Sequence, residues 1–130
     1  MTQGGKMAKK EVQYLQGADF TVSLKALMQK GGQYQKAAER VQQAWAKAHL
    51  GGHSHAEVFV GLTTTNNGEN RIENCVKFDL TGFARLVTTY SNDICIFLFA
   101  GDHTATDKWL DKNKGMNFIA SKQGDRLRVD

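Results

Sequence analysis

Apolar residues in the first half of the chain recur at helical spacing. One apolar stripe runs from Phe20 to Met28 and a second runs from Tyr34 to Ala48, with Gly31-Gly32 between them. Repeats of three and four residues put such side chains on one side of a helix, which packs that side against a core. The pattern therefore predicts two helices joined by a glycine turn, an αα-hairpin.

The second half of the chain changes to a period of two. From residue 71 to 80 the apolar phase alternates with a polar phase, the first being Ile72, Val76, Phe78 and Leu80 and the second Arg71, Glu73, Cys75, Lys77 and Asp79. This alternation predicts a half-buried strand, with the apolar phase against the helices and the polar phase on an open face. Residues 84–90 and 94–100 predict two more strands, joined by a hairpin turn at 91–93. The run ICIFLFA is apolar on both phases, as in a strand at the centre of the sheet or under helices on both sides.

Shorter signals complete the prediction. Residues 11–15 alternate and can form a strand, 57–62 can form an edge strand, and Thr104 can cap a helix over 104–114. We therefore predict an α+β domain, with an antiparallel sheet of about four strands, the N-terminal helical hairpin on one face and a short C-terminal helix. A flexible N-terminus (1–10), a single domain (11–115) and a C-terminal tail (116–130) make up the expected organisation.

Composition narrows the classes of function only a little. The 130 residues carry 17 Lys and Arg against 13 Asp and Glu, a formal charge of +4, which is compatible with a nucleic-acid partner and with many other roles. The two cysteines, Cys75 and Cys95, lie in apolar strand patterns, so we expect reduced, buried thiols in a cytoplasmic protein. No apolar run reaches the ~20 residues of a membrane span, and we expect no membrane partner.

Chemistry-bearing motifs are few. Three histidines, His49, His53 and His55, cluster in one loop, but without a carboxylate or thiol at ligand spacing. A metal site there is conceivable, yet a polar loop is the better interpretation, and we expect neither a metal nor a small-molecule cofactor. Nucleophile motifs, phosphate loops and dinucleotide fingerprints are not found.

The remaining candidates form one constellation. Arg71 and Lys77 share the polar phase of one predicted strand, Arg85 begins the next, and His103 follows the last. Such a set can hold a phosphodiester, because arginine neutralises its oxygens and imidazole can move a proton near neutral pH. Each residue also has a simpler interpretation. Arg85 can pair with an aspartate at 79 or 102, Lys77 can be solvated, and His103 can cap the last helix.

The order of elements and the run KFDLTGFARLVTTYSNDICIFLFAGDHTATDKWL resemble the RelE/ParE toxin superfamily. In that superfamily a basic strand is followed by a turn and by Arg-Leu-Val. A hairpin and an apolar strand that ends in glycine come next, and a basic residue or histidine precedes the last helix. The resemblance covers the order of elements over about residues 11–114 and is concentrated in 71–110. Cys75 departs from the pattern, because the best-known members carry a second strand lysine there, and the loop over 49–70 is longer than in compact members.

The resemblance implies a toxin that cleaves messenger RNA on the ribosome, by attack of a 2′-hydroxyl on the adjacent phosphodiester. It implies Lys77, Arg85 and His103 as catalytic residues and Trp109 as a substrate-binding residue, and it implies a cognate antitoxin as partner. From its place on the polar phase of the strand, we expect Arg71 to bind substrate as well. Trp109 stands where the family has tyrosine, and it can instead be a core residue. Other members of the superfamily inhibit DNA gyrase and lack the catalytic set. A non-catalytic nucleic-acid- or protein-binding module on the same fold is therefore the alternative, and a small domain of a larger assembly is a third interpretation.

Overall fold

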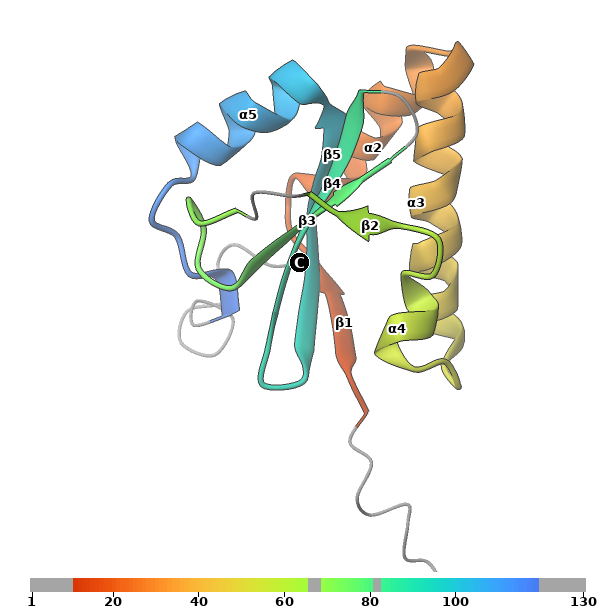
Figure 1. Cartoon of the computed structure of the whole chain (residues 1–130), viewed down its shortest axis with the longest axis vertical. Helices are drawn as coiled ribbons and strands as arrows, with labels where there is room; N and C mark the ends of the chain where they lie inside the picture. The colour runs from red at the N-terminus through yellow and green to blue at the C-terminus, as the bar shows by residue number, and fades with distance from the viewer. Residues whose placement is uncertain (1–10, 66–68, 81–82, 120–130) are drawn as a thin grey trace, which may run out of the picture.

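The computed structural model describes residues 11–65, 69–80 and 83–119. Over these residues the chain is an α+β fold, as predicted, with an open, mixed sheet and helices on both of its faces (Figure 1). The strands are β1 (Gln13–Gln16), β2 (Thr63–Thr64), β3 (Cys75–Asp79), β4 (Ala84–Ser91) and β5 (Ile94–Asp102). The helices are α2 (Phe20–Gln29), α3 (Gly32–Leu50), α4 (His55–Val58) and α5 (His103–Lys112).

The sheet has five strands in the order β1-β5-β4-β3-β2. Neighbouring strands from β2 to β5 run antiparallel, whereas β1 pairs with β5 in parallel. The prediction of an all-antiparallel sheet of about four strands is therefore right for β3, β4 and β5 and wrong in detail. Alternation along a short strand carries no information about its direction or its partner, and the two residues of β2 are too few to produce a pattern.

The β4–β5 hairpin turns where the sequence predicts it. Asn92 and Asp93 occupy the two central positions with φ of 54° and 59°, between the register pair Ser91 and Ile94. Asparagine and aspartate tolerate this left-handed conformation better than most residues, and it matches the twist of two-residue hairpins. The hairpin thus sets the register of the two longest strands.

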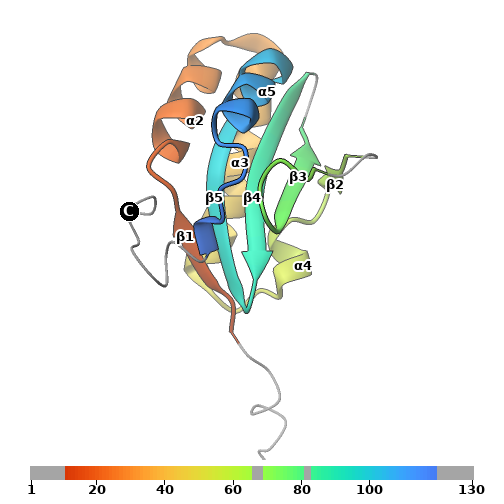
Figure 2. The ribbon, with the colours of Figure 1, turned by 90° about the vertical axis from the view of Figure 1, so that its left-hand side faces the viewer.

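One face of the sheet is covered by α2, α3 and α4 (Figure 2). Phe97 of β5 is fully buried at the centre of this layer, and its ring contacts those of Phe20, Trp45 and Phe59. Helix α3 presents small residues to this layer, Ala37, Ala38, Val41 and Ala44. The predicted helical pair is present, with its apolar stripes turned toward the sheet.

The sequence predicts that the opposite face is open. In the structure this face is instead partly covered by α5 and the segment after it. Trp109 and Leu110 of α5 are buried there together with Phe118 and Ile119, over Val87, Ile96 and Leu98 of the sheet. Strand β5 therefore has a buried layer on each side, which confirms the interpretation of its two apolar phases.

Three local predictions are wrong. Ile72 does not share a face with Val76 and Phe78, because the strand begins at Cys75 and Asn74 turns the chain with φ of 59°. Ile72 is buried under α5 instead.

The second concerns residues 57–62, where the expected edge strand is replaced by α4 and a turn. Ser54 and Glu57 form a reciprocal capping box that starts this short helix. The third is the cap of the last helix. The side chain of Asp102, rather than that of Thr104, accepts the Ala105 N–H, at 2.7 Å.

Some predictions fall outside the described residues. These are the flexible N-terminus (1–10), residues 66–68 of the loop over 49–70, and most of the C-terminal tail (120–130). Over the part of the chain that is described, no helix is both long enough and apolar enough to cross a bilayer.

Replacement of Phe97 by alanine is expected to cost about 3–5 kcal/mol of unfolding free energy, because it removes the ring around which three helices pack. Phe83→Ala is the matched control, since its ring is 65% exposed and should change stability by less than about 0.5 kcal/mol. Urea unfolding of both variants checks this. Equal losses in the two variants would contradict the assignment of Phe97 to the centre of the core.

Candidate functional site

Arg71 is the most heavily bonded cation of the candidate set. Nε and one Nη2 hydrogen donate to the two carboxylate oxygens of Glu69, at 2.8 and 2.9 Å. The other Nη2 bond goes to the Asp107 carboxylate, and Nη1 donates to the Asp107 carbonyl and to the Asp111 carboxylate, at 3.1–3.4 Å. A guanidinium has five N–H donors, so all five are used. Arg71 therefore clamps α5 to the segment before β3.

The Arg71 backbone reinforces this clamp. Its carbonyl accepts the Gly115 N–H at 2.7 Å, and its N–H donates to Glu69. We call the side chains of Glu69, Arg71, Lys77, Asp107 and Asp111 the Arg71 network.

Glu69 links this network to the sheet. Its side chain is only 5% exposed, and it also accepts from Lys77 Nζ of β3, at 3.2 Å. The hydrogen bonds from Arg71 lower the pKa of Glu69 to about 2, burial opposes that shift, and Lys77 adds to it. The same contacts raise the pKa of Arg71, so both groups remain charged at neutral pH. The side chain of Lys77 is only 12% exposed, so the simpler interpretation of Lys77 as a solvated lysine is wrong.

Arg85 forms a separate pair at the end of the sheet. Its Nε lies 3.0 Å from Asp79, its cross-strand register partner on β3, and Nη1 donates to the Ala84 carbonyl. Its register partner on β5 is Gly101, which has no side chain on this face. The Phe99 ring takes that space, since a Cβ at Gly101 would come within 2.7 Å of it. These contacts leave Nη2 of Arg85 without a partner among the described residues.

His103 is the first residue of α5. Its ring is 57% exposed, and Nε2 lies 3.5 Å from Asp107, one helical turn further on. Asp107 also binds Arg71, so the imidazole is joined to the Arg71 network through one carboxylate. His103 does not cap the helix, because Asp102 has that role.

The four predicted polar residues lie on one side of the sheet. Lys77 and Arg85 alternate with residues that face the helical layer of α2 and α3, and so point to the α5 side. Arg71 is bound to α5 and His103 begins it. The predicted pairing of Arg85 with the aspartate at 79 is confirmed. The sequence missed the acidic partners of Arg71 on α5, because an ion pair across 36 or 40 residues leaves no local pattern. The one available signal was the spacing of Asp107 and Asp111, which puts both carboxylates on one side of a helix.

Trp109, the fifth predicted residue, lies elsewhere. Its ring is 8% exposed, stacks on Phe99 and Phe118, and donates its indole N–H to the Asp19 carboxylate, at 2.8 Å. A ring enclosed in this way cannot stack on a nucleotide base in this structure. Its predicted role in substrate binding is therefore not carried further, and Trp109 ties α5 to the start of α2.

The histidines of the loop make aromatic contacts. His55 stacks on Tyr90 at 4.1 Å between ring centres, and its Nδ1 lies 3.0 Å from the Tyr14 hydroxyl. His49 packs edge-on against Trp45. Among the residues that the structure describes, no three His, Cys, Asp or Glu side chains are grouped as a metal site would require.

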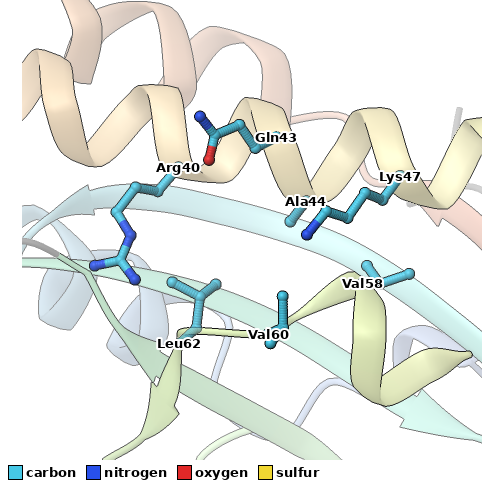
Figure 3. A pocket seen from close by; sticks show the side chains of 7 residues that line it. All are labelled: Arg40, Gln43, Ala44, Lys47, Val58, Val60 and Leu62. Carbon is cyan, nitrogen blue, oxygen red and sulfur yellow. The ribbon is translucent and has the colours of Figure 1, made fainter. Parts of the chain in front are cut away.

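A second surface feature lies on the other side of the sheet, between α3 and the segment after α4 (Figure 3). The groove is lined from α3 by Arg40, Gln43, Ala44 and Lys47, and from the opposite side by Val58, Val60 and Leu62. Both cations are bonded to backbone carbonyls, Arg40 to that of Gly61 and Lys47 to that of Glu57. The groove holds no nucleophile or imidazole, so the α5 side of the sheet is the better candidate site.

Comparisons of the chain with protein-family models, curated proteins and solved structures gave no match. The resemblance to the RelE/ParE superfamily therefore remains a prediction, and the site is interpreted from its own geometry.

Glu69→Gln should destabilise the protein by about 1–3 kcal/mol at pH 7, because it removes the charge that Arg71 and Lys77 face in a largely buried position. The folded-state pKa is below the ordinary 4.5, so the stabilisation is present above pH 4.5 and is lost as pH falls toward 2. The difference between wild type and variant should therefore shrink between pH 7 and pH 3 in urea unfolding. Glu39→Gln, on the exposed side of α3, is the control, and a difference that stays constant with pH would contradict the assignment.

His55 gives a second prediction that depends on pH. Burial against Tyr90 and Tyr14 lowers the pKa of His55 below 6.5. As pH falls, the imidazole is therefore protonated in the unfolded chain at a higher pH than in the folded protein. Stability should therefore decline from pH 7.5 to 5.5 in wild type, and decline less in His55→Gln. Thermal unfolding across this range checks it, with the exposed His53→Gln as control. If the His53 variant loses the pH dependence and the His55 variant keeps it, this explanation fails.

Proposed function

We propose that this chain is a RelE-type toxin that cleaves messenger RNA on the ribosome and is neutralised by a cognate antitoxin. The observation that carries the proposal is the position of Arg85 and His103. Arg85 is the register partner of Gly101 near the end of β5, and His103 begins α5 directly after that strand. Figure 1 shows α5 continuing from that end of β5. A cation with a donor to spare and an exposed imidazole are what cleavage of a phosphodiester by its own 2′-hydroxyl requires.

The proposed roles follow from the contacts of each residue. Arg85 directs Nη2 and its shared donors to the non-bridging oxygens of the scissile phosphate and stabilises the charge that develops on them. The 2′-oxygen bonds to phosphorus and loses its proton, the bond to the 5′-oxygen breaks, and that oxygen gains a proton. His103 serves one of these two proton transfers, held by Asp107.

Lys77 and Arg71 have indirect roles in this proposal. Lys77 and Asp79, the register partner of Arg85, lie on the same face of β3. The positive charge of Lys77 therefore adds to the electrostatic potential near Arg85, although Lys77 is bonded to Glu69. Arg71 is a positioning residue in this proposal, because its donors are all occupied and it fixes α5, which carries His103.

A second candidate is a non-catalytic binding module, ParE-like in acting on gyrase or binding another protein or nucleic acid. The specific observation in its favour is that Arg71, Lys77 and Arg85 each face a carboxylate, so that any phosphate must compete with Glu69 or Asp79. This candidate predicts intact messages in a translation extract and growth effects that follow DNA damage.

The test is primer extension (toe-printing) of messages translated in a bacterial extract with the purified protein. Wild type should produce new breaks within codons. Arg85→Ala should slow cleavage about 10²–10³-fold and His103→Ala about 10²–10⁴-fold, the losses typical of removing one charge-stabilising donor or one proton-transfer group. Lys36→Ala is the matched control, because that lysine is exposed on α3 across the sheet, and it should cleave like wild type.

Two results would overturn the proposal. One is a folded wild-type protein that leaves all messages intact, and the other is equal cleavage by wild type, Arg85→Ala and His103→Ala. Circular dichroism of each variant distinguishes lost chemistry from lost folding.

A further inference from the structure

Phe83 is an aromatic side chain that the fold leaves in solvent. It is 65% exposed, and it is the one aromatic among the large exposed hydrophobic residues of the described chain, which are Val22, Leu50, Val60 and Phe83. On the α5 side of the sheet the other rings are enclosed, since Phe99, Trp109 and Phe118 stack on one another. A single exposed ring needs no explanation by itself, so its meaning depends on the residues beside it.

The position of Phe83 connects it to the candidate site. Phe83 directly precedes Ala84 and His103 directly follows Asp102, and Ala84 and Asp102 are register partners. Both residues therefore leave the sheet at the same point of the β4–β5 ladder. Phe83 is the turn residue directly before β4 and is two residues from Arg85 along the chain.

The spacing suits a nucleotide. The Cα atoms of Phe83 and Arg85, two residues apart in the chain, are at most roughly 7 Å apart, which a phosphate and a base of the same or an adjacent nucleotide can bridge. The site otherwise lacks an aromatic platform, because Trp109 is buried and engaged with Asp19. RNA-binding surfaces recognise unpaired bases by stacking them on exposed aromatic rings beside cations that hold the backbone.

We propose that Phe83 is the base-stacking residue of this site, receiving an unpaired RNA base next to the phosphate held by Arg85. This inference rests on the proposed function, in that it names how the same site holds its substrate. Phe83 is not a catalytic residue, because it takes no part in proton transfer. Its contribution is to binding, and stacking of one base on an aromatic ring is worth about 1–3 kcal/mol, or roughly 5- to 150-fold in affinity.

The test measures binding apart from cleavage, with short single-stranded RNA whose 2′-hydroxyls are methylated so that it cannot be cut. Phe83→Ala should weaken binding roughly 5- to 150-fold relative to wild type. Phe83→Leu keeps an apolar side chain but removes the aromatic plane, and it should weaken binding almost as much. Phe83→Trp should bind at least as well as wild type, and its indole fluorescence should be quenched by the RNA.

A second set of RNAs identifies the contact as stacking. Each probe lacks the base at one position, and at one of these positions the loss should weaken wild-type binding while leaving the Phe83→Ala variant unaffected. The inference is overturned if Phe83→Leu binds like wild type, if Phe83→Ala is unaffected, or if wild type does not bind these RNAs at millimolar concentration. Cleavage in the translation extract with no dependence on Phe83 would remove this inference and leave the proposed function standing. Binding that depends on Phe83 without any cleavage would remove the proposed function and leave the stacking site.

Discussion

The arrangement on the α5 side of the sheet depends on the bond between Glu69 and Arg71. Glu69 is nearly buried and charged, and it stays charged because Arg71 and Lys77 donate to it. An uncompensated carboxylate at such a depth would cost several kcal/mol, so the three groups are stable only together. Arg71 in turn extends the contact to Asp107 and Asp111 of α5. One charged cluster thus connects the segment before β3, the sheet and the last helix.

This cluster divides the cations of the candidate site into two kinds. Arg71 has every donor engaged and Lys77 is largely buried against Glu69, so both act through the framework. Arg85 and His103 lie where β4 begins and β5 ends, Arg85 with Nη2 unbonded among the described residues and His103 with more than half of its side chain in solvent. The position of His103 follows from the framework, because the Arg71 network and the Trp109–Asp19 bond fix the helix that begins with it. The side chains of Arg85 and Arg71 are about equally exposed, at 21% and 24%, so the difference between them lies in how many of their donors are already engaged.

The sequence predicted those parts of the fold that depend on local pattern. The helical hairpin follows from apolar stripes and Gly31-Gly32, and the β4–β5 hairpin follows from Asn92-Asp93, which tolerate left-handed backbone. What failed depends on distant contacts. The parallel pairing of β1 with β5 joins residues about 80 positions apart, and Ile72 changes face because one left-handed residue, Asn74, precedes the strand.

Alternation predicts the side of the sheet correctly for Lys77 and Arg85, and the predicted pair of Arg85 with Asp79 is present. Arg71 lies before the strand and His103 after it, so their positions follow from the turn and from α5. Glu69, however, lies in a turn-rich loop whose composition suggests solvent, and only the folded chain shows it buried between two cations. Trp109 shows the converse, because its place in a motif suggested a ligand contact, while its apolar surroundings enclose it.

The central claim is that Arg85 and His103 are available to a phosphate, whereas Arg71 is committed to the framework. Nitrogen-15 NMR of the arginine and histidine side chains, recorded while an uncleavable single-stranded RNA is added, measures this directly. The account predicts that the Arg85 guanidinium and His103 imidazole signals shift together with RNA concentration while the Arg71 signal stays in place. A shift of Arg71 with Arg85 and His103 unchanged would contradict it.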